Sequence, residues 1–371
     1  MGEAKIKATQ FKKMVFLFTI GTSIILVPSA LASDAKNDAW TPVLLGTMAA
    51  LLLIGLYLAL ARLVPGKTIV EICMVLFGKW IGMFFSLSLF LYSFLLTTLV
   101  LRNLGDFLTA SMFPETPITA IHLVYLLIVA IGIRYGLSNL ARTMDIFYPF
   151  IIILFIIFVI LLMPEIKFNQ IQPVLSNGIS PILNATYSYV SFPCLEYVLF
   201  LMILPHVEDP REGGKAFVKG MLLGGLVLLA ITTLCLLVMG SEMTANNLYA
   251  SFELAKIIKI GEFLQRVEVI IAVIWFVTIY CKLIVCFYMT IQTFSQSFKL
   301  GEYHPLIFPI GMLILAASII IAPDMGYFIS FDRYVWTICA FIFGFVLPLL
   351  FLLTAMVRHS WIKSKSGSRS T

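Results

Sequence analysis

The apolar segment Phe18-Thr-Ile-Gly-Thr-Ser-Ile-Ile-Leu-Val-Pro28 decides the fold class of this chain. It belongs to an apolar run at 11–33, which is long enough to cross the hydrocarbon core of a bilayer. Gly21-Thr22-Ser23 and Pro28 interrupt this run near its middle. A spanning helix tolerates such an interruption because neighbouring helices and local rearrangement satisfy the freed backbone groups. We therefore predict a membrane-spanning helix that is broken partway across.

The composition of the whole chain supports a lipid environment. Of its 371 residues, 61% are hydrophobic and 12% are charged. A soluble core of this size could not bury so much apolar surface without leaving large patches in water. We therefore predict an all-α polytopic integral membrane protein that forms a single membrane domain over 1–371.

Ten apolar runs are long enough to span a membrane. Basic residues precede the first run, which we interpret as a span rather than a cleaved signal, since nine further runs follow. The ten predicted transmembrane helices lie at 11–33, 42–62, 81–111, 119–137, 142–163, 185–205, 216–240, 266–296, 306–323 and 335–357.

The ten spans divide into a first repeat at 11–163 and a second repeat at 185–357. Spans one and six open the two halves, and span six is interrupted by Ser191, Phe192, Pro193 and Cys194. Paired broken helices at matched positions indicate the binding site of carriers built from inverted repeats. A ligand's carboxylate and ammonium can satisfy the amides and carbonyls freed at a break. The alternative is an ordinary proline kink, in which Ser and Thr hydroxyls satisfy the backbone.

Most of the 25 Lys and Arg residues fall in connections that share a side with the N-terminus. The positive-inside rule therefore predicts that both termini are cytoplasmic, with a basic, flexible tail at 358–371 that contacts anionic lipid. The segment 65–80 predicts an amphipathic helix at the inner surface. The segment 164–184 predicts an outer loop, and 246–264 predicts one or two short outer helices.

Charged residues inside spans are costly and need a reason. Glu196 and Lys282 lie near the middle of spans six and eight, where a contact between them would neutralise both charges. The alternative is that each faces an unrelated polar cavity. Arg102 and Asp106 lie on one face of span three and could pair. Because they sit near its outer end, we favour snorkelling to the interface.

Further side chains have the spacing of a central site. Tyr92, Leu96 and Thr97 lie on adjoining turns of span three, and Thr278, Cys281 and Lys282 share one side of span eight. The alternative is helix packing, where small and hydroxyl-bearing residues are common. The six cysteines and four histidines are dispersed, with neither a CxxC pair nor a Ser/His/Asp grouping, and no P-loop or dinucleotide fingerprint is present. We expect no catalysis, cofactor, metal or nucleic acid.

The chain resembles the amino acid–polyamine–organocation (APC) transporter superfamily, and within it the B subunits of bacterial spore germinant receptors. The resemblance rests on five short motifs in order along essentially the whole chain: Gly21-Thr-Ser-Ile-Ile-Leu-Val-Pro28, Gly78-Lys-Trp-Ile-Gly82, Tyr92 ten residues before Arg102, Gln172-Pro-Val174 and Ser191-Phe-Pro-Cys-Leu-Glu196. The chain departs from this pattern at Thr22-Ser23 and at Pro193-Cys194. These departures leave the identity of the ligand open.

This resemblance implies a LeuT/APC-like 5+5 inverted repeat with helices 1 and 6 broken. It implies a germinant-sensing subunit that works with an A subunit and a lipoprotein C subunit in the spore inner membrane. The ligand would be a small nutrient such as an amino acid or a sugar. The residues implied to bind it are Gly21, Thr22, Ser23, Tyr92, Leu96, Phe192, Pro193, Cys194, Thr278 and Cys281, with Glu196 and Lys282 as structural and charge support.

A second function remains open on the same pocket, that of a proton- or sodium-coupled amino-acid permease, because a fold does not decide between sensing and transport. The resemblance also allows Lys282 to occupy a position that a coupling cation fills in sodium-driven relatives.

Overall fold

The structure is a computed structural model that describes residues 5–175, 178–258 and 266–367, with side chains up to 358. Within those ranges the chain is helical, and the extended backbone is limited to one isolated bridge between Ile6 and Val207. The helices are α1 (Ala8–Ile20), α2 (Ser23–Ala35), α3 (Trp40–Leu63), α4 (Ile69–Ser111), α5 (Ile118–Arg134), α6 (Gly136–Leu162), α7 (Ile179–Tyr189), α8 (Pro210–Asn246), α9 (Ala250–Ile257), α10 (Glu268–Ser297), α11 (Ile307–Ile320), α12 (Met325–Phe331), α13 (Thr337–Phe341) and α14 (Leu347–Gly367).

Short 3-10 and π segments connect or extend these helices. They are η1 (Lys36–Asp38), η2 (Met163–Glu165), η3 (Phe168–Ile171), η4 (Val190–Cys194), η5 (Leu195–Met202), η6 (Leu204–His206), η7 (His304–Leu306), η8 (Asp332–Trp336) and η9 (Ile342–Val346). The π segments are η4, η8 and η9.

Within the described residues, 6 helical stretches are long and apolar enough to cross a membrane: α3, α4, α6 with η2, α8, α10 and the run from α12 into α14. The bent pair α1 and α2 adds a seventh, while α5 and α11 are shorter apolar helices. The chain is thus an all-helical membrane protein, as its composition predicts.

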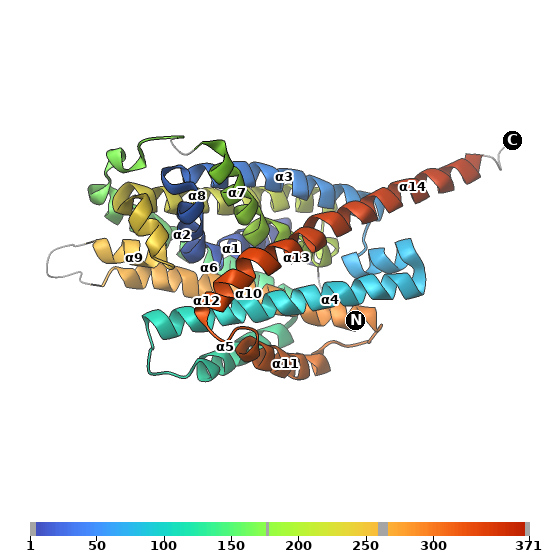
Figure 1. The fold of residues 1–371 in the computed structure, drawn as a ribbon. Helices are drawn as coiled ribbons and strands as arrows, with labels where there is room; N and C mark the ends of the chain where they lie inside the picture. Colours follow the sequence, from blue (N-terminus) through green and yellow to red (C-terminus); the bar gives the residue numbers. More distant parts are fainter. Residues whose placement is uncertain (1–4, 176–177, 259–265, 368–371) are drawn as a thin grey trace.

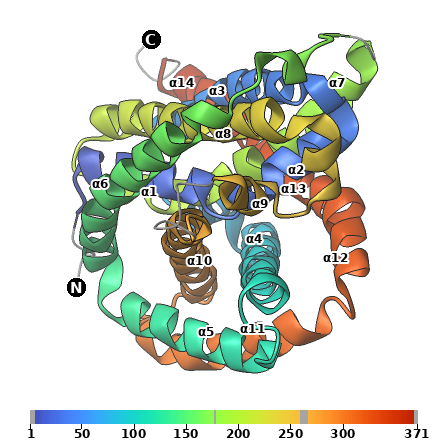
Figure 2. The same cartoon turned by 90° about the vertical axis from the view of Figure 1, so that its left-hand side faces the viewer.

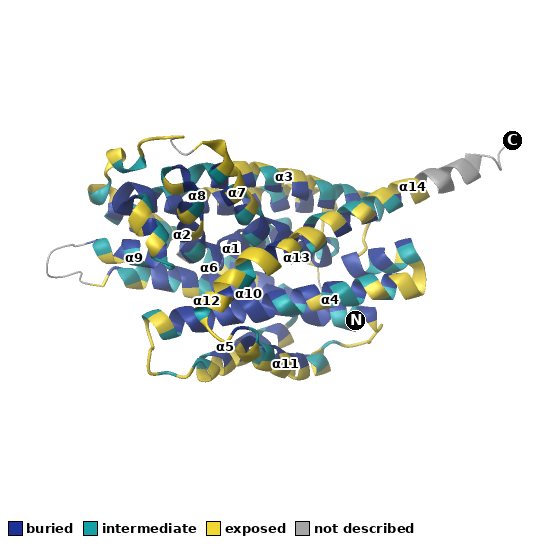
Figure 3. Cartoon of the chain, viewed as in Figure 1, coloured by how far each residue is buried: buried dark blue, intermediate teal, exposed yellow. Residues whose placement is uncertain are grey.

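Helices α4 and α10 run side by side through the middle of the molecule (Figures 1 and 2). Figure 2 shows α5 and α11 covering them on one side, with α3 and α8 on the other. Buried residues concentrate on α8 and α10, while α6 and the α12 to α14 run expose broad apolar faces. Figure 3 shows the exposed face of the α12 to α14 run. Outer apolar faces are the normal contact of a protein with lipid chains.

The first break falls at the predicted place. Helix α1 ends at Ile20, Gly21 leaves helical geometry with φ −23° and ψ −98°, and α2 starts at Ser23 with its axis bent by 46°. Glycine is required by a close approach, because a Cβ built at Gly21 would lie 2.8 Å from the Cβ and Cδ atoms of Lys282.

The predicted interruption at 191–194 takes another form. Helix α7 passes into the π turn η4 and then the 3-10 helix η5 without unwinding. Pro193 has no N–H to donate, so the regular ladder cannot continue through it. The backbone instead forms one wider π turn, in which the Leu195 N–H donates to the carbonyl of Val190.

The amphipathic segment predicted at 65–80 forms the first part of α4. Thr68 and Glu71 close a reciprocal capping box at its start. Gly78 has a φ of +76°, where only glycine is unstrained, and it reverses the chain so that Gly82 packs against the backbone of Cys73 and Met74.

Two further connections refine the predicted outline. The segment at 246–264 contributes one short helix, α9, and residues 259–265 lie outside the described part of the chain. Helix α14 continues to Gly367, so the backbone of the predicted tail is helical up to that residue.

The snorkelling predicted for Arg102 and Asp106 is wrong. Both side chains are only 9% exposed, and the Arg102 Nε–H donates to both carboxylate oxygens of Asp106 at 2.9 Å. The connection before α12 packs over this turn, and its Ala322 carbonyl accepts a 2.6 Å hydrogen bond from Arg102 Nη1. The i,i+4 pair weighed as the alternative is confirmed, and it ties α4 to the start of α12.

Breaking this pair on one side should destabilise the fold more than removing it whole. Arg102→Met leaves the Asp106 carboxylate buried without its partner and should cost about 3 kcal/mol, whereas Arg102→Met with Asp106→Leu should recover most of that loss. Thermal unfolding of the purified protein in detergent measures both variants. A double variant as unstable as Arg102→Met alone would contradict the pairing.

Candidate functional site

Lys282 reaches from α10 into the break between α1 and α2. Its Nζ lies 2.7 Å from Glu196 Oε2 and donates a 2.9 Å hydrogen bond to Thr22 Oγ1. The Lys282 and Glu196 side chains are 1% and 0% exposed. A single buried ion pair therefore joins α10, the first break and the start of η5.

Aromatic rings enclose the same ammonium group. Lys282 Nζ lies 5.2 Å from the ring centroid of Phe18 and 5.0 Å from that of Phe192. Rings at this distance attract a cation through the negative charge on their faces. Together with Glu196 and Thr22, they give a buried lysine a favourable environment.

Helix α10 also satisfies part of the backbone freed at the break. The Thr278 hydroxyl donates to the Gly21 carbonyl at 3.5 Å and to the Trp275 carbonyl at 3.1 Å. Thr278 and Lys282 lie one turn apart on α10, as the spacing indicates, and both face the break. A side chain of the protein itself thus provides part of the hydrogen bonding at the break that was expected from a ligand.

Some buried polar atoms at this centre have no hydrogen-bond partner among the described residues. They are Ser23 Oγ, Tyr92 Oη and Glu196 Oε1. A buried polar atom left unpaired costs about 1–3 kcal/mol, so such atoms call for a ligand, an ordered water or a rearrangement that satisfies them. All three belong to residues predicted to form or support the binding site.

The remaining predicted residues lie buried in helix contacts. The ring of Tyr92 stacks on Trp336 and Phe343, with centroids 5.3 and 4.9 Å apart. Cys194 Sγ donates weakly to the Gly46 carbonyl at 3.9 Å. Leu96, Pro193 and Cys281 are also buried.

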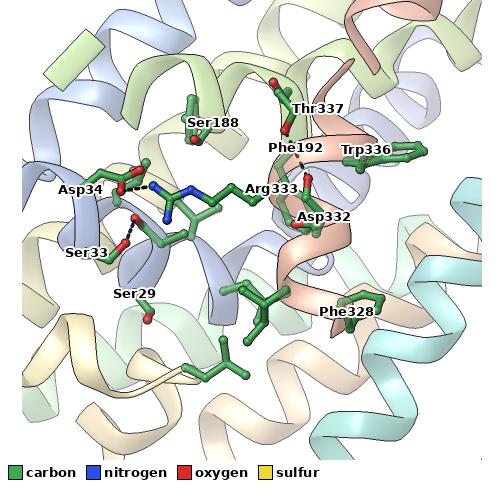
Figure 4. A pocket seen from close by; sticks show the side chains of 18 of the residues that line it. Ser29, Ser33, Asp34, Ser188, Phe192, Phe328, Asp332, Arg333, Trp336 and Thr337 are labelled. Atoms are coloured by element: carbon green, nitrogen blue, oxygen red, sulfur yellow. Dashed lines mark hydrogen bonds and ion pairs between the residues drawn. The ribbon is translucent and has the colours of Figure 1, made fainter. Parts of the chain in front are cut away.

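A cavity of about 390 Å³ lies beside the break (Figure 4). Its walls come from α2, the end of α7 with η4, the end of α8 with the connection after it, and the run from α12 to the start of α13, with Asn103 of α4. Phe192 is the predicted site residue that lines it. Because Phe192 also covers Lys282, this ring separates the cavity from the buried ion pair.

A second ion pair lies at the edge of the cavity. Arg333 on η8 extends to Asp34 near the end of α2, with Nη2 2.6 Å from Oδ1 (Figure 4). The Arg333 side chain is 52% exposed and that of Asp34 is 15% exposed, so the pair lies at the edge of the cavity. It links two segments that are far apart in the sequence.

Sequence reasoning missed this wall. Asp332 and Arg333 precede the apolar run predicted at 335–357, so their charges suggested a surface connection. The useful signal was the adjacent pair of opposite charges, Asp332 and Arg333, four and three residues before Trp336. What it did not show is the π turn η8, which places Asp332, Arg333, Trp336 and Thr337 along one cavity wall.

Comparison with known proteins then identifies the family. Residues 5–325 match the family model described as spore germination protein. The chain belongs to this spore germination protein family. Spore germination protein KB of Bacillus subtilis (strain 168) is 28% identical over 329 residues, which cover 88% of this chain and 87% of that protein.

Solved transporters share the fold of this spore germination protein. The structure of MhsT in complex with L-phenylalanine aligns with a TM-score of 0.67 at 12% identity, covering 96% of this chain and 99% of the other. A sodium-coupled sialic acid symporter aligns with a TM-score of 0.65 at 13% identity, covering 92% and 79%. At such low identity these likenesses show a LeuT-like transporter fold.

The close approach at the first break predicts that Gly21 cannot be replaced. Gly21→Ala would push its Cβ into the backbone-proximal part of Lys282, and overpacking of this kind costs about 1–3 kcal/mol. The matched control is Gly55→Ala in α3, where a Cβ meets no atom within 4 Å and helix propensity favours alanine by about 1 kcal/mol. Thermal unfolding in detergent should show a loss for the first and no loss for the second. Equal midpoints would contradict the packing of Lys282 against Gly21.

Proposed function

We propose that this chain is the nutrient-sensing subunit of a spore germination receptor and that a small nutrient binds in the cavity beside the first helix break. The observation that carries the proposal is this cavity in a member of the spore germination protein family. Its volume of about 390 Å³ lies within the 300–1,000 Å³ of typical small-molecule sites.

The ligand occupies the cavity and acts on the break through Phe192. A ligand seated against this ring moves Phe192 away from Lys282. The unpaired atoms of Ser23, Tyr92 and Glu196 then become accessible to the ligand. The predicted set of Gly21, Thr22, Ser23, Tyr92, Leu96, Phe192, Pro193, Cys194, Thr278 and Cys281 then forms the floor of the site.

The proposed membrane arrangement has ten spans in two halves, 11–163 and 185–357. The spans are α1 with α2, α3, α4, α5, α6, α7 through η6, α8, α10, α11, and α12 through α14. The first described residues and the end of α14 lie on the same side of the molecule (Figure 1), as an even number of spans requires. The Lys and Arg bias makes that side cytoplasmic. The membrane is the spore inner membrane.

Signalling requires partners. We propose the receptor A and C subunits, with the exposed apolar helices providing contacts to them and to lipid. The nutrient shifts the population between two conformations of the cavity, by no more than its differential affinity for the two allows. The change then passes to the partner subunits.

The alternative is a coupled amino-acid permease, which the fold shared with a sodium-coupled symporter favours. Against sodium coupling stands Lys282, whose ammonium already supplies a positive charge at the break. A tethered cation cannot be exchanged with the medium. The sensing role therefore accounts for the centre of the molecule better than sodium-driven transport does.

Filling the cavity should abolish the response to nutrients in spores. Spores that lack this chain should lose germination with particular amino acids or sugars, and Ser188→Trp, which fills the cavity, should reproduce the loss at normal protein level. The matched control is Ser180→Trp, on the exposed part of α7 away from the cavity, which should germinate as the parent does. Optical density of spores under a nutrient panel measures germination. Unchanged responses in the deletion strain would reject the sensing role.

Transport should be absent from the isolated chain. Vesicles that contain the purified protein, given a sodium or proton gradient, should not accumulate the labelled nutrients to which the deletion strain fails to respond. Accumulation that follows either gradient, against empty vesicles as the control, would support the permease instead.

A further inference from the structure

The negative and positive charges of the residues that line the cavity are unequal in number. The lining holds the carboxylates of Asp34 and Asp332 and the guanidinium of Arg333. Arg333 is committed to Asp34 through the 2.6 Å ion pair. The Asp332 carboxylate has neither a hydrogen bond nor an ion pair with any residue in the part of the chain that the structure describes. The cavity thus contains one carboxylate without a partner.

The buried cation of Lys282 does not supply that partner. Its ammonium is held by Glu196 Oε2 and Thr22 Oγ1, behind the ring of Phe192. A partly buried carboxylate without a counter-charge is costly. The lining is therefore complementary to a ligand that brings a positive charge.

The backbone at Asp332 is shaped to hold this group in place. Asp332 begins the π turn η8, and its carbonyl accepts a 3.2 Å hydrogen bond from the Thr337 hydroxyl. Trp336, in the same turn, is held by stacking on Tyr92. Single π turns inside helices occur frequently at functional sites. Asp332 is thus carried on a helical segment that packs against α4 through Trp336 and Tyr92.

The other lining groups suit the rest of such a ligand. The aromatic side chains of Phe192, Phe328 and Trp336 line the cavity near Asp332 (Figure 4). Aromatic faces attract ammonium groups, and together with a carboxylate they favour an amine over a neutral hydroxyl. The amides of Asn103 and Asn246 also line the cavity, where they can meet uncharged polar groups of the ligand.

We infer that the cavity selects small molecules bearing a protonated amine, with Asp332 as the residue that binds the ammonium. This inference rests on the proposed function, in which the same cavity is the nutrient site. It separates the two nutrient classes that the sequence leaves open, because a sugar offers no cation to Asp332. It also makes the amine the group that decides binding, because Arg333 is already paired with Asp34.

The test is ligand-dependent thermal stability of the purified full chain in detergent, because a ligand that binds only the folded state raises the unfolding midpoint. The probes are small L-amino acids, their amides, the corresponding 2-hydroxy acids, and hexoses. We expect stabilisation by amine-bearing probes and at least tenfold weaker binding when a hydroxyl replaces the amine. Asp332→Asn should weaken amine binding at least tenfold, and Asp332→Glu should restore part of it. The control Asp324→Asn, at the N-cap of α12 outside the cavity, should bind as the parent does.

Each other result overturns the inference in a recognisable way. Stabilisation by hexoses or hydroxy acids that Ser188→Trp abolishes would keep the cavity as the nutrient site and reject the amine. Stabilisation by amines that Asp332→Asn leaves unchanged would reject Asp332. Stabilisation by none of the probes would reject the ligand class, while the germination of the deletion strain decides the sensing role separately.

Discussion

The buried ion pair between Lys282 and Glu196 is the interaction on which the centre of this protein depends. A helix broken inside a bilayer leaves backbone groups that lipid cannot satisfy. Here Lys282 fills the space above Gly21, donates to Thr22 and balances Glu196, while Thr278 donates to the freed carbonyl. The break is stable because α10 supplies what the lipid does not.

The position of the cavity follows from this arrangement. With the break occupied by lysine, the open volume lies next to it, on the far side of Phe192. Its walls are formed where two helical runs leave regular geometry, at the π turns η4 and η8. A wide turn changes which side chains face inward, so the same departures that interrupt the helices also shape the site. The ring of Phe192 lines the cavity and also lies against Lys282 at the break.

Membership of the spore germination protein family is compatible with the fold of a transporter. A carrier moves its ligand by exchanging conformations around a central site, and a receptor needs the same exchange without release on the other side. A lysine tethered at the centre opposes the exchange of ions there. The ion pair of Arg333 with Asp34 supplies a contact between α2 and η8 at the edge of the cavity.

The sequence alone determined the membrane class, the helical architecture, the place of the first break and the family resemblance. These properties depend on local composition and on residues close together in the chain, such as Gly21 beside Thr22. The partnership of Glu196 with Lys282 was open to inference because a charge in a span needs a counter-charge. Only the tertiary structure decided that Lys282 fills the break and that Arg102 and Asp106 are buried. It also decided that the open cavity is walled by Asp34, Asp332 and Arg333, because spacing along one chain does not reveal which distant helix packs against a given turn.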